Sequence, residues 1–422
     1  MPVHYPCGIT SEVAAVPLRY LYLDMNAYFA SVEQLDDPSL MGKPIVVAAA
    51  DAATTSCIAA SYEAKACGIR TGTALWEARR LCPGVIVKVG RHSRYVDVHQ
   101  QILRAVGRCV PIHVVMSIDE MACGLLGDER ASAKAWTIAR QVKAAIRDDI
   151  GPALRCSVGL GPNILLAKVA GKMQKPDGLT EFADADIPAK LYALKLRDFP
   201  GIGAQMEKRL NRAGVGSVKQ LYSLTMTQLC NIWQSKVLGE RWFFQLRGDD
   251  IADPETHRRT VGHSHVLPPD LRSDSGSHGV LSRLIHKAGA RLRSIDYWAG
   301  ALTLGLSYVR GGRWSAGRKF VHCRDTSALL RVAGELWTGR PKDAGPPLQV
   351  WMVLTDLIPA RGATPSLFAE DRNLTQLSEI MDRVNRAFGK HAVRFATMHG
   401  AEDTAPNRIA FTQIPQTRPD LD

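Results

Sequence analysis

The chain has 422 residues, more than a single hydrophobic core usually supports, so two or more domains are expected. Its 46% hydrophobic and 22% charged residues are typical of a globular protein and exclude an intrinsically disordered chain. The formal net charge of +12 favours a polyanionic partner, and nucleic acid is the first candidate.

The cysteines and the apolar runs define the compartment we expect. The 9 cysteines show no Cys-x-x-Cys pair or metal-ligand spacing, which is typical of buried thiols in a reducing compartment. The sequence contains no run of about 18 apolar residues, so it predicts no membrane span. The first residues lack the pattern of a signal peptide. We therefore expect a cytoplasmic, nucleoid-associated protein without membrane contact.

The predicted elements change in character along the chain. Up to about residue 180, apolar strands alternate with helices as in an α/β or α+β domain. The strands are expected at 18–23, 43–49 and 155–161, and the helices at 27–36, 74–81, 98–106 and 164–173. A short helical block at 183–247 and a polar linker at 248–258 follow. Residues 259–354 then predict a second mixed module, with strands at 302–309 and 348–354.

The second module is the most basic part of the chain. It contains 14 Lys and Arg against 6 Asp and Glu, a local net charge of +8. The residues beyond it predict one amphipathic helix, at 375–388.

Acidic residues end two of the apolar strands near the N-terminus. Asp24 directly follows the strand 18–23, and Asp119 and Glu120 end the stretch 114–120. Either site alone is more often a solvated turn. Together, three carboxylates at strand ends suffice to hold a pair of divalent cations, which take oxygen ligands and promote phosphoryl transfer.

Several short motifs occur around these carboxylates in a fixed order. They are the runs 24–34, 60–65, 117–120, 157–163 with Leu166-Ala167-Lys168, and Lys175-Pro176-Asp177-Gly178. In these motifs the chain resembles the Y-family translesion DNA polymerases, in the branch of bacterial polymerase IV and the polymerase V catalytic subunit. The resemblance extends from about residue 18 to residue 354.

The resemblance implies an α+β multidomain fold of the right-hand polymerase type. The palm would be ferredoxin-like and span 1–27 and 92–182, with small fingers at 28–91. A helical thumb with a helix–hairpin–helix would span 183–247, followed by the linker 248–258. An α/β little finger would occupy 259–354, and 355–422 would form a C-terminal tail.

The resemblance also implies roles for individual residues. Asp24, Asp119, Glu120 and the backbone carbonyl of Met25 would bind two Mg²⁺ ions, with Mn²⁺ as an alternative. Phe29 would be the steric gate against a ribose 2′-hydroxyl. The other nucleotide contacts would be Tyr28, Tyr62, Lys65 and Lys168.

The implied partners are primer–template DNA, deoxynucleoside triphosphates and a sliding clamp, with the protein itself a monomer. Expected DNA contacts in the thumb are Gly201, Gly203, Lys208 and Arg209, because paired glycines and a helix N-terminus let backbone N–H groups approach a phosphate. In the basic module they are Arg283, Lys287, Arg310 and Arg313. Leu367 and Phe368 are expected to contact the clamp, although they could equally be packing residues.

These features predict a low-fidelity DNA polymerase that acts in DNA damage repair and tolerance. Two departures from the family pattern keep alternatives open. Asn26 replaces an aspartate, and Lys65 stands where arginine is usual. One alternative is a non-catalytic adaptor of the same family, although such relatives typically lose the carboxylates that persist here. Another is a basic DNA-binding protein with nuclease activity.

Overall fold

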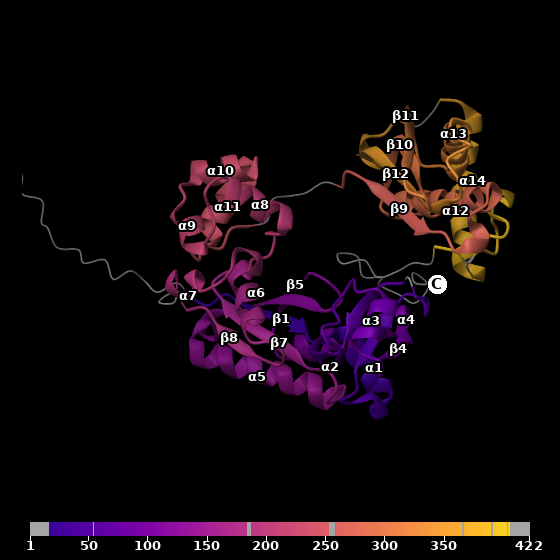
Figure 1. Cartoon of the computed structure of the whole chain (residues 1–422). Helices are drawn as coiled ribbons and strands as arrows, with labels where there is room; N and C mark the ends of the chain where they lie inside the picture. Colours follow the sequence, from indigo (N-terminus) through magenta and orange to yellow (C-terminus); the bar gives the residue numbers. More distant parts are fainter. Residues whose placement is uncertain are drawn as a thin grey trace, which may run out of the picture. The chain divides into compact units, whose positions relative to one another are not determined.

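The computed structural model of the chain describes residues 17–405, apart from 54, 184–186, 253–257, 365–366, 390 and 403 (Figure 1). The described residues form two compact units, one up to residue 252 and one from residue 258 to residue 405. No helix in the described ranges is long and apolar enough to cross a membrane.

The centre of the first unit is a five-stranded sheet with the order β5-β6-β1-β7-β8. Its middle strand β1 (Tyr20–Met25) pairs antiparallel with β6 (Glu120–Gly124) on one side and β7 (Cys156–Gly161) on the other. Figure 1 shows α6 and α5 on opposite faces of this sheet. The remaining elements are β5 (Ile112–Val115), β8 (Leu179–Glu181), α4 (His92–Gly107), η2 (Gly127–Arg130), α5 (Ser132–Asp149) and α6 (Ile164–Met173).

Helix α6 packs very closely on β7 because two strand residues are glycines. A Cβ atom at Gly159 would lie 2.0 Å from the carbonyl oxygen of Ala167 and 2.3 Å from the backbone nitrogen of Gly171. Both obstructing atoms are backbone, so a side chain would force the helix away from the sheet.

We therefore predict that Gly159→Ala costs about 3 kcal/mol of unfolding free energy or more, because overpacking a core against backbone is poorly relieved. The matched control is Gly107→Ala, since a Cβ there meets nothing within 4 Å. Chemical denaturation measures both variants, and equal stabilities would contradict the prediction.

A three-stranded sheet, β3-β2-β4, forms a separate small core in the same unit. Its strand β2 pairs antiparallel with β3 and parallel with β4. The elements of this part are α1 (Tyr28–Asp36), η1 (Pro38–Leu40), β2 (Ile45–Ala48), β3 (Cys57–Ala60), α2 (Tyr62–Ala66), α3 (Leu75–Leu81) and β4 (Ile86–Val89).

A block of short helices completes the first unit. Its core includes Leu166 and Val169 of α6, so the block is continuous with the face of the large sheet that α6 covers. The helices are α7 (Ala189–Tyr192), η4 (Leu196–Asp198), α8 (Ala204–Arg212), α9 (Val218–Ser223), α10 (Met226–Trp233) and α11 (Lys236–Gln245).

The second unit is a four-stranded antiparallel sheet, β11-β10-β12-β9, with helices α12 and α13 packed on one face. Its elements are β9 (Val261–Val266), η5 (Pro269–Leu271), α12 (Asp274–Ser294), β10 (Tyr297–Tyr308), β11 (Arg313–Cys323), α13 (Thr326–Thr338), β12 (Pro347–Pro359), η6 (Ala360–Gly362), α14 (Ala369–Phe388) and η7 (Ala396–Met398).

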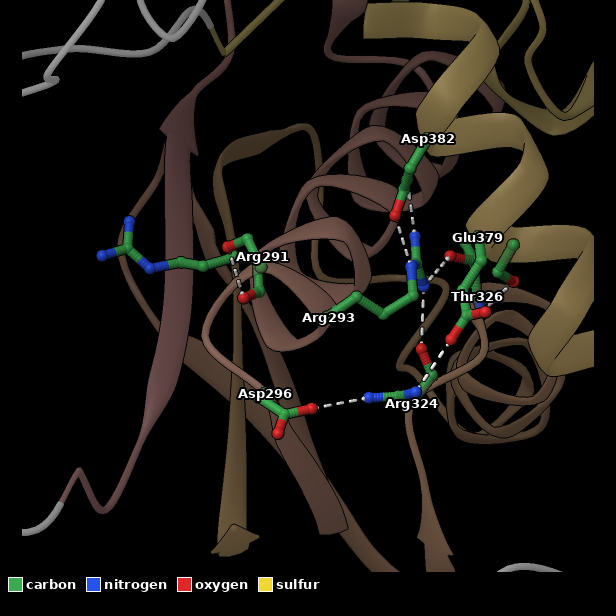
Figure 2. Close-up of polar contacts among 9 residues, drawn as sticks. Arg291, Arg293, Asp296, Arg324, Thr326, Glu379 and Asp382 are labelled. Atoms are coloured by element: carbon green, nitrogen blue, oxygen red, sulfur yellow. Dashed lines mark hydrogen bonds and ion pairs between the residues drawn. The ribbon is translucent and has the colours of Figure 1, made fainter. Parts of the chain in front are cut away.

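The described residues between 355 and 405 belong to this unit and do not form a separate tail. Strand β12 continues to Pro359, and Ala401 and Ala405 are buried in the core of the sheet and α12. Figure 2 shows how α14 is attached: the guanidinium of Arg293 binds both carboxylate oxygens of Asp382 at 2.5 and 2.9 Å, and Arg324 donates to Glu379 at 2.8 Å. Residues 406–422 lie outside the described residues.

Candidate functional site

The three carboxylates singled out in the sequence converge at one end of the large sheet. Asp24 and Glu120 are directly opposite each other in the pairing of β1 with β6. The backbone N–H of Met25 donates to the carbonyl of Asp119 at 2.8 Å, which holds the residue before β6 against the end of β1. Asp24 is only 8% exposed, so the sheet places the carboxylates together and largely out of water.

Burial makes this group of acids electrostatically costly. It raises the pKa of the Asp24 carboxyl to about 6, against the opposing effect of Lys175, and Glu120 and Asp119 raise it further. Burial also raises the pKa of Asp119. At Glu120 burial acts in the same direction, but the hydrogen bond and charge of Lys168 outweigh it and hold the pKa below its usual value. Such a set needs compensating positive charge.

Two lysines supply that charge. Lys168, on α6, places its Nζ 2.8 Å from Glu120 Oε2, and Lys175 places its Nζ 2.5 Å from Asp24 Oδ1. Within the described ranges, no three acidic, histidine or cysteine side chains are arranged as a ready-made metal cluster. The donor set nevertheless fits hard divalent cations, because carboxylate oxygens are their preferred ligands.

The two aromatic residues after β1 pack against Tyr95 of α4. Ala27 adopts a left-handed conformation (φ 49°), where the chain turns from β1 into α1. Tyr28 is buried and donates its hydroxyl to the carbonyl of Tyr95 at 2.6 Å. Phe29 is only half-buried, and its ring stacks on that of Tyr95 with centroids 4.3 Å apart. The Phe29 ring is therefore fixed by its stacking on Tyr95 and remains partly accessible to solvent.

Tyr95 has a supporting role that the sequence did not reveal. Its hydroxyl donates to Glu33 Oε1 at 2.8 Å, and Arg91 binds the same carboxylate with both Nε and Nη2. These contacts connect α4 to α1 and fix the ring on which Phe29 rests. The contacts of Arg91 and Tyr95 with Glu33 join residues about 60 positions apart, so no local sequence pattern indicates them.

Tyr62 and Lys65, on α2, face the same acidic group. The Lys65 Nζ lies 4.2 Å from the centre of the Tyr62 ring. The pKa of Tyr62 is raised by burial and by the charge of Asp24, and that of Lys65 is lowered by burial and by Lys175. Of the residues that the resemblance assigned to the nucleotide, Lys168 thus contacts a carboxylate directly, and Tyr62 and Lys65 lie close enough to Asp24 for its charge to act on them.

Asn26 has a clear structural role despite its departure from the family pattern. Its Nδ2 donates to Ser157 Oγ at 3.0 Å, and its Oδ1 accepts the backbone N–H of Asp177 at 2.7 Å. It therefore connects β1 to β7 and to the turn that carries Lys175. The sequence motif at 175–178 was visible, but its contact with Asn26 was not.

The glycines that are expected to bind phosphate lie in the turn before α8. Gly201 has φ 92°, and Gly203 is the N-cap of α8 without a side-chain cap. Lys208 and Arg209 are exposed on this helix, and Arg209 donates to the carbonyl of Ile232 at 3.3 Å. The geometry leaves backbone N–H groups at the start of α8 free to meet a phosphate.

The DNA contacts expected in the second unit differ in how exposed their side chains are. Arg310 and Arg313 are exposed at the turn between β10 and β11. Arg283 is only 6% exposed, and Lys287 donates to the carbonyl of Ala405 at 3.0 Å. The prediction that Arg283 presents its charge to DNA is wrong, because α12 packs against the sheet on one side and against η7 and α14 on another.

The residues expected to contact a clamp are accessible. Leu367 and Phe368 are 88% and 75% exposed, so they are not the packing residues of the alternative interpretation. Pro365 and Ser366, in the same peptide, lie outside the described residues. Binding to a clamp stays a prediction.

Comparison with known proteins agrees with this arrangement. The impB/mucB/samB family model matches residues 23–172, and the model of that family's C-terminal domain matches residues 258–363. A protein of Moorella thermoacetica described as DNA polymerase IV is 33% identical over 390 residues, which cover 90% of this chain and 96% of that protein. A DNA polymerase IV of Pelotomaculum thermopropionicum is 32% identical over 380 residues, covering 88% and 93%.

The fold is similar to those of solved polymerases. A Y-family DNA polymerase chimera superimposes with a TM-score of 0.68 at 23% identity, covering 81% of this chain and 99% of that one. The insertion ternary complex of Dbh DNA polymerase gives a TM-score of 0.52 at 23% identity and the same coverage. The expected α+β multidomain fold is therefore confirmed.

Proposed function

Because the chain belongs to the impB/mucB/samB family, we propose that its catalytic site consists of Asp24, Asp119 and Glu120. The protein is a DNA-directed DNA polymerase of the Y family and carries out translesion synthesis. The observation that supports this site is the register of β1 and β6, which places the buried Asp24 opposite the half-buried Glu120. The ion pairs of Lys168 with Glu120 and of Lys175 with Asp24 support a site for the anionic triphosphate beside these carboxylates.

The three carboxylates and the Met25 carbonyl would hold two divalent cations, for which we propose Mg²⁺, with Mn²⁺ as an effective substitute. Ions bound there would lower the pKa of the primer 3′-hydroxyl and neutralise charge on the triphosphate.

The side chains around the carboxylates position the nucleotide. Lys168 and Lys65 present ammonium groups to the triphosphate, and Tyr62 lies beside Lys65. Phe29, fixed by its stacking on Tyr95, occupies the side where a ribose 2′-hydroxyl would lie. Holding the reactants in this geometry and compensating their charge accounts for most of the catalysis in such reactions.

We propose that DNA contacts the second unit on the sheet face opposite α12 and α13. In the strand register, Arg313 lies beside Ser307, and Lys319 lies beside Ala301. By strand alternation these side chains share the face opposite the buried Leu302, Leu304 and Leu306. Both cations are exposed, and their partners Ser307 and Ala301 are small, so phosphates could reach them.

Replacing Arg313 and Lys319 with glutamine is expected to weaken primer–template binding to a similar extent for all DNA sequences. The slope of log affinity against log salt should become shallower by about one unit for each lost phosphate contact. The control is Lys342→Gln, an exposed lysine outside these strands. Fluorescence anisotropy at several salt concentrations measures the effect, and an unchanged slope would exclude this face.

Primer extension tests the proposed function against its alternatives. A polymerase lengthens a labelled primer only when deoxynucleotides are present, a nuclease shortens it, and an adaptor binds it without change. Retention of all three carboxylates supports the first outcome, and no comparison favours the adaptor.

A further inference from the structure

A tryptophan ring lies over the middle of the sheet in the second unit. Trp351, on β12, is paired with Gly305 of β10 on one side and with Ser264 of β9 on the other. A Cβ atom at Gly305 would lie 2.4 Å from Cζ2 and 2.6 Å from Cε2 of the indole. The six-membered part of the ring therefore rests against the backbone of β10, in space that only a glycine leaves free.

Strand alternation places this ring on the sheet face opposite α12 and α13, which we call the open face. The residues before and after it, Val350 and Met352, are fully buried in the core, whereas Trp351 is partly exposed. The row of paired residues continues from Gly305 to Ser315 of β11. The ring thus has only small side chains beside it in its own row, and solvent reaches part of its surface.

The neighbouring rows of the open face carry positive charge and no negative charge. One row consists of Val266, Gln349, Ser307 and Arg313, and the other of Gly262, Val353, Thr303 and Gly317. By strand rise, Arg313 lies about 7 Å along the sheet from the row of Trp351, and Lys319 lies about 13 Å from it in the opposite direction. Both cations are exposed, so the aromatic ring has an accessible positive charge on either side.

An accessible ring between two cations is suited to an unpaired base. In a duplex the faces of the bases are stacked on one another and are not available to a side chain. A single strand can turn a base onto an aromatic ring while its phosphates meet nearby cations, and every base has a face that can stack in this way. A polymerase substrate contains such unpaired bases, in the template beyond the primer end.

We propose that the open face binds single-stranded DNA, with one unpaired base stacked on Trp351 and nearby phosphates of the same strand at Arg313 and Lys319. This inference deepens the proposed contact of DNA with this face and rests on it. It specifies the ligand as an unpaired strand and adds a contact to a base where the proposed function supplies only contacts to phosphates.

The test compares two labelled oligomers of equal length, an oligothymidylate and an abasic strand, by fluorescence anisotropy. In Trp351→Leu, apolar atoms still cover Gly305 but the ring is lost. This variant is expected to bind oligothymidylate about tenfold more weakly than wild type, and the abasic strand and a blunt duplex within about twofold of wild type. Trp351→Phe keeps a ring and should lose less than about threefold. The matched control is Trp76→Leu, which removes an exposed tryptophan on α3.

The salt dependence distinguishes stacking from phosphate binding. Stacking releases no counter-ions, so Trp351→Leu should lower the affinity for oligothymidylate without changing the slope of log affinity against log salt. Arg313→Gln/Lys319→Gln should make that slope shallower. Thermal unfolding of each variant establishes that it is folded.

A second measurement needs no variant. An oligothymidylate that carries one 5-iodouracil base is irradiated while bound to the wild-type protein, which joins the base to an aromatic ring in contact with it. Mass spectrometry then identifies the attached peptide. We expect the peptide that contains Trp351, and attachment confined to other peptides would overturn the inference.

The remaining outcomes separate this inference from the proposed function. Unchanged binding of oligothymidylate by folded Trp351→Leu would overturn the stacking, and an equal loss for the abasic strand would do so too, because the ring would then only support the sheet. If Arg313→Gln/Lys319→Gln leaves both affinity and salt slope unchanged, the proposed DNA face itself falls. A loss in that double variant without a loss in Trp351→Leu would retain the face and exclude the stacked base.

Discussion

Replacing Asp119 and Glu120 together with alanine is expected to abolish primer extension, with a fall in rate of roughly a thousandfold or more. These carboxylates are two of the three acidic ligands that the sheet brings together. Without them the site retains Lys168, Lys175 and Lys65 and would carry an excess of positive charge. It could not hold the cations that activate the primer hydroxyl.

DNA binding by this variant should be retained or become tighter, because two negative charges near the DNA backbone are lost. The matched control is Asp128→Ala/Glu129→Ala, an adjacent acidic pair on the exposed turn η2 of the same unit. This control should extend primers like wild type. Normal extension by Asp119→Ala/Glu120→Ala would refute the assignment of the site, and loss of DNA binding would indicate that these carboxylates are structural.

The second large effect is expected at Phe29. In Phe29→Ala the ring that faces the sugar is removed, so a ribose 2′-hydroxyl meets no obstruction. We expect the ratio of kcat/KM for deoxynucleotides to that for ribonucleotides to fall by about 100-fold, equivalent to about 2.7 kcal/mol. Steady-state incorporation of matched deoxy- and ribonucleotides measures this ratio.

Two further variants separate the ring of Phe29 from its support. Phe29→Tyr keeps an aromatic ring and should remain selective. Tyr95→Phe keeps the stacked ring, which lies 4.3 Å from that of Phe29, but loses the hydrogen bond to Glu33. It should also remain selective, with a small loss of stability of about 1 kcal/mol. Unchanged selectivity in Phe29→Ala would exclude Phe29 as the steric gate.

The apolar run at 18–23 correctly predicted a strand with Asp24 near its end, but the prediction that Asp119 and Glu120 end a strand is wrong. Strand β5 ends at Val115, and Glu120 instead begins β6, because the chain turns between these strands. The predicted strand at 18–23 corresponds to β1 (Tyr20–Met25), and the predicted helix at 164–173 has the bounds of α6 (Ile164–Met173). Local sequence predicts both elements. An apolar run predicts β1, and a Gly-Pro-Asn turn followed by an apolar segment predicts α6. Their mutual contact follows from the strand pairing, which the sequence alone did not specify.

Contacts between distant segments could not be predicted from the sequence. The ion pair of Lys175 with Asp24 joins residues on separate elements, and Asn26 fixes the turn through a contact spanning 151 positions. The spacing of residues on α12 also did not show that Arg283 and Arg293 are covered. The sheet packs on one side of this helix, and α14 supplies Asp382 to Arg293 on another (Figure 2).

The central claim is template-directed nucleotidyl transfer that depends on a divalent cation. The most direct measurement is insertion of a single nucleotide by the wild-type protein, with each deoxynucleotide supplied alone opposite each template base, with Mg²⁺ and with EDTA. We predict that the primer is lengthened by one residue, that the complementary nucleotide is preferred opposite every template base, and that EDTA abolishes the reaction. Insertion that ignores the template base, shortening of the primer, or full activity in EDTA would contradict the account.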